Sequence, residues 1–479
     1  MCHESARGAV GEIKERSAVL KRILIKNAAV ASVDPAIGEL PAGDILIEGE
    51  RILDVRPGLV ADADETIDAT GCIAMPGMID AHRHLWEGGF RGVTSDWSIL
   101  DFVGNVRFLA ASFFRPEDMY ATALLGSYEA LNAGVTTVAD YCHNVRSPDH
   151  AHETLRGIRE AGGRSVWGFG FVSLAHTGQA FSNEDRLAFL KTLKAEQFAS
   201  DDSLVRLAIC PREVSLWGDD LASVKAQFAF AREAGMQIFM HNNALGNPRY
   251  VMKLAEHDLL SDRLTLVHMG STDADEWEAV GAAGTSVCFT PETEYQMAMG
   301  WPSSADAARA GVNICIGTDM TANNSADMFF PTRMFMQVER SMLSQKMGPE
   351  PFIGAPISCA EALEWATIKA ARAVGLADVA GSLTPGKYAD IVLLRADGPS
   401  MAGWDRRKPA TAILQQGGVN AVDTVIVGGR FAKRDGRLLA DTSRAVRMQE
   451  ETVARVHALA VDNGGFEADL ETIQRRMAG

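Results

Sequence analysis

Five side chains of metal-binding type stand at the ends of short apolar runs that lie far apart in the chain: His82, His84, His241, His268 and Asp319. Side chains alternate between the two faces of a β-strand, so His82 and His84 point to the same side and can bind one ion together. Imidazole with carboxylate suits zinc, and also iron, manganese or cobalt. Any one of these histidines alone fits a core or surface role, but the set fits it poorly. The pattern therefore predicts one shared metal site.

The bulk composition limits the class of protein. The chain has 479 residues, of which 47% are hydrophobic, which permits a large α/β domain together with a second unit. Lys plus Arg number 46 and Asp plus Glu 62, so the formal charge is −16. Phosphate binding needs basic clusters and the sequence shows none, so we do not expect nucleic acid as a partner.

The expected location follows from the cysteines and from hydropathy. The seven cysteines form no CxxC pair, and several lie in apolar runs, as is typical of reduced core residues. Residues 1–21 are interpreted as an N-terminal extension, without an apolar stretch of signal-peptide length, and no later segment approaches the length of a membrane span. We expect a cytoplasmic protein with no membrane partner.

The order of expected elements indicates an α/β fold. After Pro76 and Gly77, strand-like runs alternate with amphipathic helical patterns, and many of the helices end in Gly. The eight expected strands are Met78–His82, Val135–Tyr141, Ser165–Val172, Leu204–Cys210, Gln237–His241, Leu264–His268, Ser286–Thr290 and Asn313–Asp319. Eight such units favour a closed (β/α)8 TIM-type barrel over a doubly wound sheet. The five side chains then lie at the carboxyl ends of strands, where such barrels carry out their chemistry.

The two ends of the chain are rich in β pattern and are expected to pair into a small β-sandwich, which makes the second domain discontinuous. The predicted division is residues 1–21 as extension, 22–75 as the first part of the sandwich, 76–378 as the barrel, 379–440 as the second part of the sandwich and 441–479 as a C-terminal helical tail.

Three stretches of sequence carry a family resemblance. Pro76–His84, the later His241, His268 and Asp319, and Gly381–Val392 together resemble the amidohydrolase superfamily, over residues 22 to about 440. The branch that looks nearest contains cytosine deaminases, adenosylhomocysteine deaminases and chlorohydrolases. The resemblance implies a barrel mounted on a β-sandwich built from both chain ends.

The resemblance also implies the ligand set. One divalent ion, zinc by preference, would be held by His82, His84, His241 and Asp319, with His268 close by. Dinuclear members of the superfamily carry a carboxylated Lys at the end of strand four. The corresponding stretch here, Leu207–Glu213, contains no Lys, so we expect a single ion.

The sequence departs from the deaminases at two places. Their fifth strand carries a Glu three residues after the His, which shuttles a proton to the substrate, and this chain has Ala244 there. After strand seven, where deaminases show Pro-x-Ser-Asn, this chain has Pro291, Glu292, Thr293 and Glu294. We expect Glu294, ahead of Glu292, to protonate the leaving group, with a solvated loop pair as the alternative interpretation.

The expected chemistry is hydrolysis by metal-activated water. Water on such an ion has a pKa lowered from about 16 towards 7, Asp319 is placed to accept its proton, and His268 to polarise the substrate or orient the hydroxide. The predicted function is hydrolysis of a non-peptide carbon–nitrogen bond in a small apolar or heterocyclic molecule. The alternatives are deamination of a purine, pyrimidine or other aminated heterocycle, and removal of a non-nitrogen leaving group such as chloride. A non-catalytic scaffold barrel is disfavoured because the ligands are retained.

Contacts to the substrate are less determined. Trp86 and Arg91 begin an aromatic, Gly-rich segment after the first barrel strand, which either caps an apolar ligand or packs in an oligomer interface. His143 follows the second strand and is assigned either to substrate hydrogen bonding or to a structural role. We take all three as substrate-binding candidates and expect a homo-oligomer, a dimer or higher.

Overall fold

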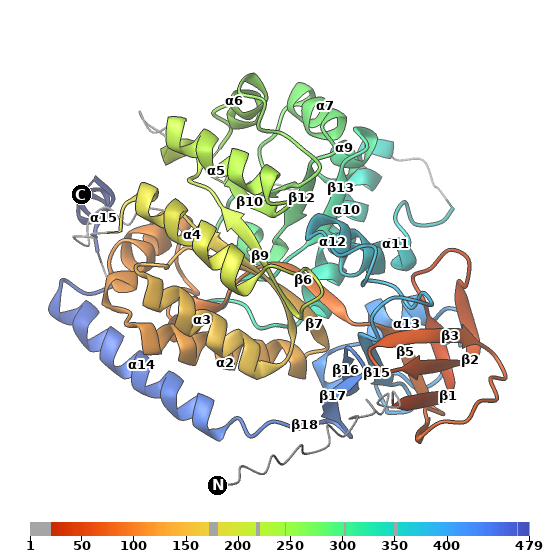
Figure 1. Cartoon of the computed structure of the whole chain (residues 1–479). Coiled ribbons are helices and arrows are strands. Elements are labelled where there is room, and N and C mark those ends of the chain that lie inside the picture. Colours follow the sequence, from red (N-terminus) through yellow and green to blue (C-terminus); the bar gives the residue numbers. More distant parts are fainter. Residues whose placement is uncertain are drawn as a thin grey trace, which may run out of the picture.

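The computed structural model contains two units, a barrel and a separate β-sheet (Figure 1). The residues it describes are 21–171, 181–216, 221–244, 246–300, 303–348, 353–466 and 468–478. Most of the N-terminal extension predicted at residues 1–21 lies outside the described residues.

The barrel sheet is parallel throughout and closes on itself. Its strands follow the order β13-β12-β11-β10-β9-β8-β7-β6-β14, so β14 returns to pair with β6. The strands are β6 (Met78–His84), β7 (Val135–Cys142), β8 (Arg164–Gly170), β9 (Val205–Cys210), β10 (Gln237–Asn242), β11 (Leu264–His268), β12 (Ser286–Phe289), β13 (Asn313–Ile316) and β14 (Asp319–Met320). The predicted TIM-type barrel is confirmed.

The eighth strand is interrupted, which the sequence pattern did not predict. β13 pairs with β12, and β14 pairs with β6, with Gly317 and Thr318 between the two pieces. A Cβ atom on Gly317 would lie 2.7 Å from the carbonyl oxygen of His82, so only Gly allows this close approach. The shift from one neighbour to the other closes the ring and turns Asp319 towards His82 and His84.

Helices surround the barrel and alternate with its strands (Figure 1). Their first residues show the expected capping chemistry: Ser182 and Asp185 form a reciprocal capping box at the start of one helix, and Ser147 caps another. The helices are α2 (Pro116–Asn132), α3 (Pro148–Ala161), α4 (Asn183–Gln197), α5 (Leu221–Glu233), α6 (Tyr250–Glu256), α7 (Ala274–Ala282), α8 (Pro291–Gln296), α9 (Ser304–Arg309), α10 (Phe329–Met347), α11 (Cys359–Trp365) and α12 (Ile368–Ala373). A further helix, α13 (Pro409–Gln416), lies in the chain between two strands of the second unit.

Strands from both chain ends form the second unit, as predicted, but they are joined in one nine-stranded sheet. The order is β18-β17-β16-β15-β5-β1-β2-β3, with β4 pairing on β1. The two chain ends meet where β5 runs antiparallel to β15. The strands are β1 (Arg22–Ala31), β2 (Glu39–Glu48), β3 (Arg51–Arg56), β4 (Glu65–Asp68), β5 (Cys72–Pro76), β15 (Ile391–Arg395), β16 (Val422–Val427), β17 (Arg430–Arg434) and β18 (Arg437–Leu438).

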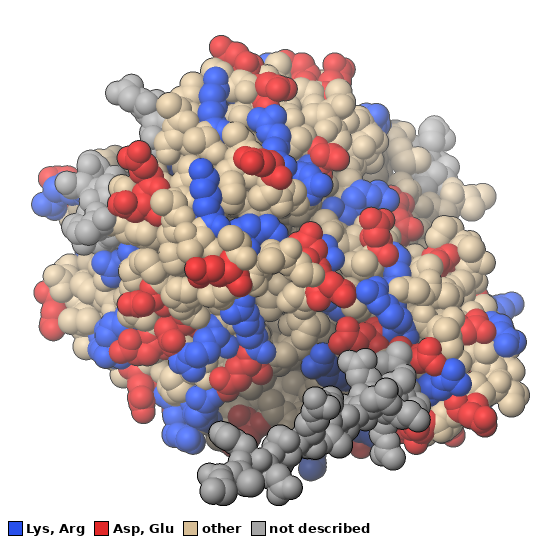
Figure 2. Space-filling view, viewed as in Figure 1, with Lys and Arg blue, Asp and Glu red and all other residues tan. Residues whose placement is uncertain are grey.

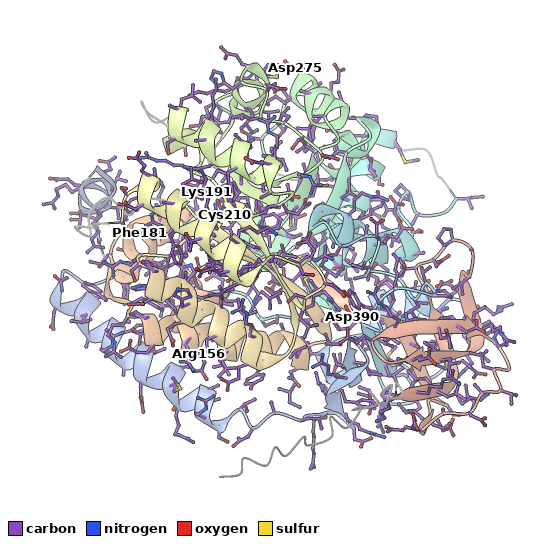
Figure 3. All side chains as sticks on the ribbon, viewed as in Figure 1. Arg156, Phe181, Lys191, Cys210, Asp275 and Asp390 are labelled. Carbon is purple, nitrogen blue, oxygen red and sulfur yellow. The ribbon has the colours of Figure 1, made fainter. Side chains whose placement is uncertain are left out.

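A buried ion pair fastens the barrel to this sheet. Arg164, at the start of β8, donates to both carboxylate oxygens of Asp390 over 2.8 and 3.2 Å. Asp390 directly precedes β15 and is labelled at the junction of the two units in Figure 3. Its Oδ1 also accepts from the Gly428 amide over 2.8 Å, so both oxygens of this buried carboxylate have hydrogen-bond partners.

The segment after β6, expected as an aromatic loop, folds into short helical turns. These are η1 (Leu85–Phe90), α1 (Ile99–Phe102), the π-helical η2 (Val103–Arg107) and η3 (Ala110–Phe113). The C-terminal helices α14 (Ser443–Asp462) and α15 (Leu470–Ala478) pack over them, and the ring of His457 stacks on Phe90 at 5.8 Å.

The surface in view carries acidic and basic side chains interspersed, and neither sign gathers into a single patch there (Figure 2). Within the described part of the chain, no helix is both long and apolar enough to cross a bilayer.

Candidate active site

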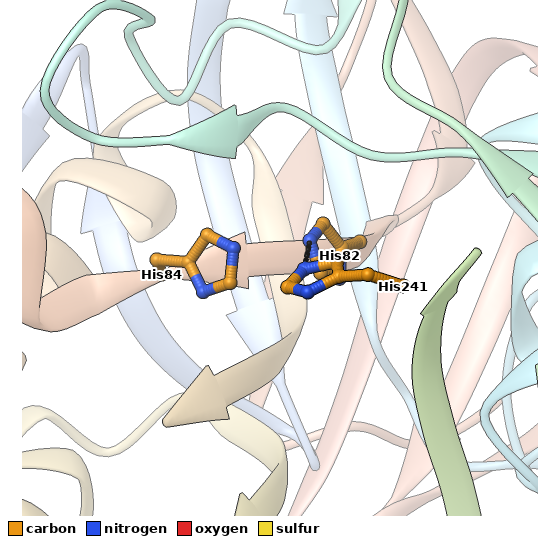
Figure 4. A group of neighbouring side chains, drawn as sticks. All are labelled: His82, His84 and His241. Atoms are coloured by element: carbon orange, nitrogen blue, oxygen red, sulfur yellow. Dashed lines mark hydrogen bonds between the residues drawn. The ribbon is translucent and has the colours of Figure 1, made fainter. Parts of the chain in front are cut away.

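Three imidazoles and one carboxylate converge at the carboxyl ends of β6 and β10 and at the first residue of β14. Nε2 of His241 lies 3.2 Å from Nε2 of His82, and Oδ1 of Asp319 lies 3.2 Å from Nε2 of both His82 and His84. Figure 4 shows the three imidazoles facing one another. The alternation of side chains along β6 brings His82 and His84 inwards and sends Arg83 outwards, where it pairs with Glu129.

Hydrogen bonds on the far side of two rings determine which nitrogen faces the centre. Nδ1 of His84 lies 2.7 Å from the carbonyl oxygen of Tyr141, and this nitrogen must therefore donate. Nδ1 of His241 lies 2.7 Å from Oε1 of Glu213 and donates to that carboxylate. In the neutral rings, each Nε2 then presents a lone pair to the centre, which is the arrangement of metal-ligating histidines.

The donor set fits one divalent metal ion. Ligands held at 2.0–2.1 Å in a tetrahedron lie about 3.3 Å apart, close to the 3.2 Å separations of His82, His241 and Asp319. Two lone pairs facing each other at that distance repel unless a cation lies between them. His82, His84, His241 and Asp319 would hold the ion, and His268 lies beside them, since His82, His268 and Asp319 also form a group of mutually close donors.

The pKa values of the imidazoles reflect the same geometry. Burial lowers the pKa of His82 well below its ordinary value and that of His241 to about 4, which keeps both rings neutral. Burial also penalises charge on His84, but the carboxylates of Glu87 and Asp319 outweigh it and raise its pKa to about 9. A cation bound at Nε2 of His84 therefore competes with a proton.

His268 and Asp319 are held in a strained backbone conformation. Their φ angles are +82° and +64°, in the left-handed region that non-glycine residues rarely adopt. Nδ1 of His268 lies 3.0 Å from Oγ1 of Thr290 and 3.5 Å from Oε1 of Glu294. These contacts fix the ring plane, so the opposite edge of His268 faces the cavity that it lines.

A cavity of about 180 Å³ opens above the metal-binding group. Its walls are mostly apolar, with polar groups near β9 and β10. The apolar lining residues include Ile99, Phe102, Val103, Ala244, Met299 and Met320, and the polar ones include Arg107, His143, Glu213, Asn242, Asn243 and Tyr250. Residues of the segment 99–107 thus line the cavity, which favours the cap over the oligomer interface, the two interpretations that the sequence left open.

The three expected substrate contacts lie in different places. His143 lines the cavity and its ring stacks on His84 at 4.4 Å. Trp86 is buried behind it and donates from Nε1 to Nδ1 of His143 over 2.8 Å. Arg91 is absent from the described residues that line the cavity, and its guanidinium is paired at 2.9 and 2.6 Å with Glu129 on α2.

The two expected proton donors are also separated. Glu294 is fully buried behind His268, and its Oε1 accepts from the Thr290 amide over 2.9 Å. Burial raises the pKa of Glu292 to about 7, and the charged groups that act on it are Asp327, Arg83 and Asp80, none of which lines the cavity. Neither Glu lines the cavity among the described residues, so neither faces a substrate directly.

Sequence reasoning missed three charged residues that the fold brings to the site. Glu213 holds His241, Arg107 donates from Nη1 to Glu213 over 3.3 Å, and Glu87 is buried with Oε1 lying 3.7 Å from Nε2 of His143. Glu213 comes three residues after the fourth barrel strand, and this position at the active face could have identified it from the sequence. Arg107 and Glu87 lie in a segment whose helical turns have no clear period, so nothing in the pattern pointed to them.

Comparison with known proteins identifies the family. The model of the family described as the amidohydrolase family matches residues 73–432. The chain belongs to this family. It is a metal-dependent hydrolase acting on a carbon–nitrogen bond other than a peptide bond, as its sequence predicted.

Two curated relatives cover most of the chain. A 5'-deoxyadenosine deaminase of Methanothermobacter thermautotrophicus is 29% identical over 86% of this chain and 95% of its own length. A 5-methylthioadenosine/S-adenosylhomocysteine deaminase of Desulforudis audaxviator is 28% identical over 91% of this chain and 98% of its own length.

Solved structures share the fold. An adenosine deaminase from Xanthomonas campestris with bound zinc superimposes with a TM-score of 0.81 at 23% identity, over 91% of this chain and 98% of that one. A variant of atrazine chlorohydrolase from Arthrobacter aurescens, complexed with zinc and atraton, gives a TM-score of 0.80 at 24% identity, over 90% of this chain and 100% of that one.

Proposed function

We propose that this protein is a zinc-dependent deaminase of a small aminated heterocycle. The observation that carries the proposal is the set of four donor atoms from His82, His84, His241 and Asp319 at the floor of a largely apolar cavity. The names of the two curated relatives, both deaminases, support it.

One ion per chain agrees with what surrounds the donors. The ring of Tyr141 stacks on His241 at 4.2 Å and lies 5.4 Å from His82, so an aromatic ring packs against these imidazoles. The fourth strand ends in Cys210, without a Lys to bridge a second ion. When bound, the ion would lower the pKa of water so that hydroxide forms near neutral pH.

Residues of the chain account for the proton transfers. Asp319 accepts the proton of the attacking water, since it is a carboxylate that lines the cavity at the centre of the donor set. His268 hydrogen-bonds the substrate on the side away from Thr290 and Glu294, which hold its ring. Because Glu292 and Glu294 do not reach the cavity, Asp319 returns its proton to the leaving nitrogen, which departs as ammonia.

Dechlorination is the second candidate, and one observation favours it. Ala244 lines the cavity where deaminases carry their proton-shuttling Glu, so this wall offers no acid. Chloride leaves as an anion and needs no proton, whereas an amine does.

Ammonia release from a panel of aminated purines, pyrimidines and triazines, incubated with zinc-loaded protein, tests the proposal. We expect turnover of at least one compound and loss of that turnover after chelation. A panel of matched chloro compounds gives the second reading, since chloride release without ammonia release would replace deamination by dechlorination. Neither product from either panel would contradict both.

Homo-oligomerisation and a cytoplasmic location remain predictions. α10 carries Phe330 and Met347 exposed, which fits an interface between copies, and five of the six described cysteines are buried and unpaired, which fits a reducing compartment. Light scattering of the purified protein tests the first, and a mass that matches one chain would exclude it.

A further inference from the structure

The cavity has a carboxylate that the expected chemistry does not use. Among the described residues that line it, only Asp319 and Glu213 are acidic, and Asp319 belongs to the metal-binding group. Glu213 comes from the loop that follows β9, the strand next to β10, after which deaminases carry their acid.

The two oxygens of Glu213 differ. Oε1 accepts from Nδ1 of His241 over 2.7 Å and from Nη1 of Arg107 over 3.3 Å. Oε2 has no hydrogen-bond partner in the described part of the chain, and it is not among the side-chain atoms sealed from solvent without a partner. The residue is only 7% exposed, and that exposure is towards the cavity. Oε2 is therefore a hydrogen-bond acceptor that is open to a ligand.

The other buried carboxylates near the site do not offer this. Both oxygens of Glu87 and Oε2 of Glu294 are sealed from solvent and lack partners, and Oε1 of Glu294 is used by Thr290. Glu292 lies beside Arg83 and Asp80, away from the cavity.

We propose that Oε2 of Glu213 accepts a hydrogen bond from a ring N–H of the substrate, and thereby selects heterocycles that carry an N–H beside the reacting carbon. The inference rests on the proposed function, because it assigns the substrate class of that same site. The positively charged Arg107 and the donor on His241 both favour the ionised carboxylate, which attracts an N–H and repels the lone pair of a bare ring nitrogen.

The walls fit a planar ring held in this orientation. Phe102, Val103, Met299 and Met320 line the cavity with apolar side chains, so they add contact area without competing for the N–H. Ala244 adds no donor or acceptor from its side chain. In this chain Glu213, after the fourth barrel strand, thus takes the substrate-selecting role that a Glu after the fifth strand would have.

Glu213→Gln is the sharpest variant. The amide oxygen still accepts from His241 and Arg107, and the amide NH₂ now faces the cavity. An acceptor is thereby exchanged for a donor at the same place. Wild type and variant are brought to the same zinc content before binding is measured. Glu292→Gln is the matched control, since it makes the same chemical change at a carboxylate that does not line the cavity.

Calorimetric binding of two purine-sized rings to the zinc-loaded protein tests the inference without turnover, because neither ring carries an amine. Quinazolin-4-one presents a ring N–H and quinazoline a bare nitrogen at the same position. We expect the wild type and Glu292→Gln to bind quinazolin-4-one about 10-fold to 100-fold more tightly, the range for one hydrogen bond to a charged group, and Glu213→Gln to lose or invert this preference.

Equal binding of the two rings by the wild type would overturn the inference, whatever the variant does. A preference for quinazolin-4-one that is unchanged in Glu213→Gln would also overturn it. If Glu213 binds sugar hydroxyls instead, Glu213→Gln keeps the preference of the wild type, because neither ring carries a sugar and the C4 carbonyl of quinazolin-4-one meets the same groups in both proteins. The proposed function has its own test, because it is contradicted if no ammonia is released. If no ammonia is released but the preference still depends on Glu213, the binding role of Glu213 is supported and the deaminase proposal is not.

Discussion

Two halves of the active face differ in how they are built. On the side of β6 and β14, His82, His84 and Asp319 are brought together by strand alternation and by one close approach at Gly317. On the side of β9, β10 and β11, the side chains that line the substrate cavity include Glu213, Ala244 and His268, and Arg107, which pairs with Glu213, comes from a distant helical turn. The first half has the pattern of the family, and the second departs from it.

The difference shows which features a metal site constrains. Binding one ion requires donor atoms about 3.3 Å apart, and few backbones satisfy that. Substrate recognition requires only that some side chain of the right type reaches the ligand, so an acid can be lost at one strand and another can appear on its neighbour. Four predictions test how far the two halves differ.

The largest effect is expected from Asp319→Asn, in the metal half. The change keeps the size of the side chain and removes the proton acceptor. We expect kcat to fall by about 100-fold to 10,000-fold or more, since a general base accounts for that much and a ligand charge is lost as well. Turnover of the compound identified in the ammonia panel measures it, and near-normal kcat would contradict the role of Asp319.

Glu294→Gln, in the substrate half, is expected to have an intermediate effect. Glu294 supports the ring of His268 and does not reach the cavity. Residues in such supporting positions usually change activity by about 10-fold to 100-fold, and the loss should be the same for good and poor leaving groups.

Glu292→Gln is its matched control, with kcat within about twofold of the wild type, as is usual for substitutions away from the site. A loss in Glu294→Gln that grows as the leaving group becomes poorer would restore Glu294 as the proton donor and contradict this account.

Thr318→Val tests the support of the metal half. The Thr318 amide donates to Oδ1 of Asp80 over 3.0 Å, its hydroxyl donates to the same carboxylate, and Arg83 donates to that hydroxyl. Removing the hydroxyl leaves buried charged groups short of a partner, which costs about 1–3 kcal/mol of unfolding free energy. Denaturant unfolding measures it, and an unchanged midpoint would show that this network does not stabilise the strand junction.

The smallest effect is expected from Ile473→Ala in α15, outside the residues that the family model matches. Ile473 packs so closely on Gly104 that a Cβ there would lie 2.7 Å from its Cγ2, and Gly104 lies in η2 beside the cavity-lining Val103. We expect KM to rise by about 2-fold to 10-fold with kcat retained, the usual size of coupling through packed side chains. An equal fall in kcat would indicate that the tail supports the metal half as well.

Much of the fold was predictable from local pattern. Apolar runs that end in His82, His241 and His268, separated by helices that end in Gly, are sufficient for a parallel barrel, and the β-rich chain ends indicated the second unit. The split of the eighth strand at Gly317 was not predictable, because it depends on the distance between β13 and β6 in the closed ring. The sequence of a single strand does not determine that distance.

The site shows the same limit. The metal-binding residues could be identified from their types and spacing. Arg107 could not, because its partner Glu213 lies 106 residues away along the chain. The interpretation of Glu292 as a proton donor rested on its place after strand seven. Glu292 does not line the cavity, and sequence order alone does not show which side chains of that loop face the substrate.

The most direct test of the central claim is anomalous diffraction from crystals of the zinc-loaded protein, collected at the zinc edge. The account predicts one peak per chain, at about 2.0–2.2 Å from Nε2 of His82, His84 and His241 and from Oδ1 of Asp319. Two peaks per chain, or a single peak displaced to the neighbouring group formed by His84, Glu87 and His143, would contradict it.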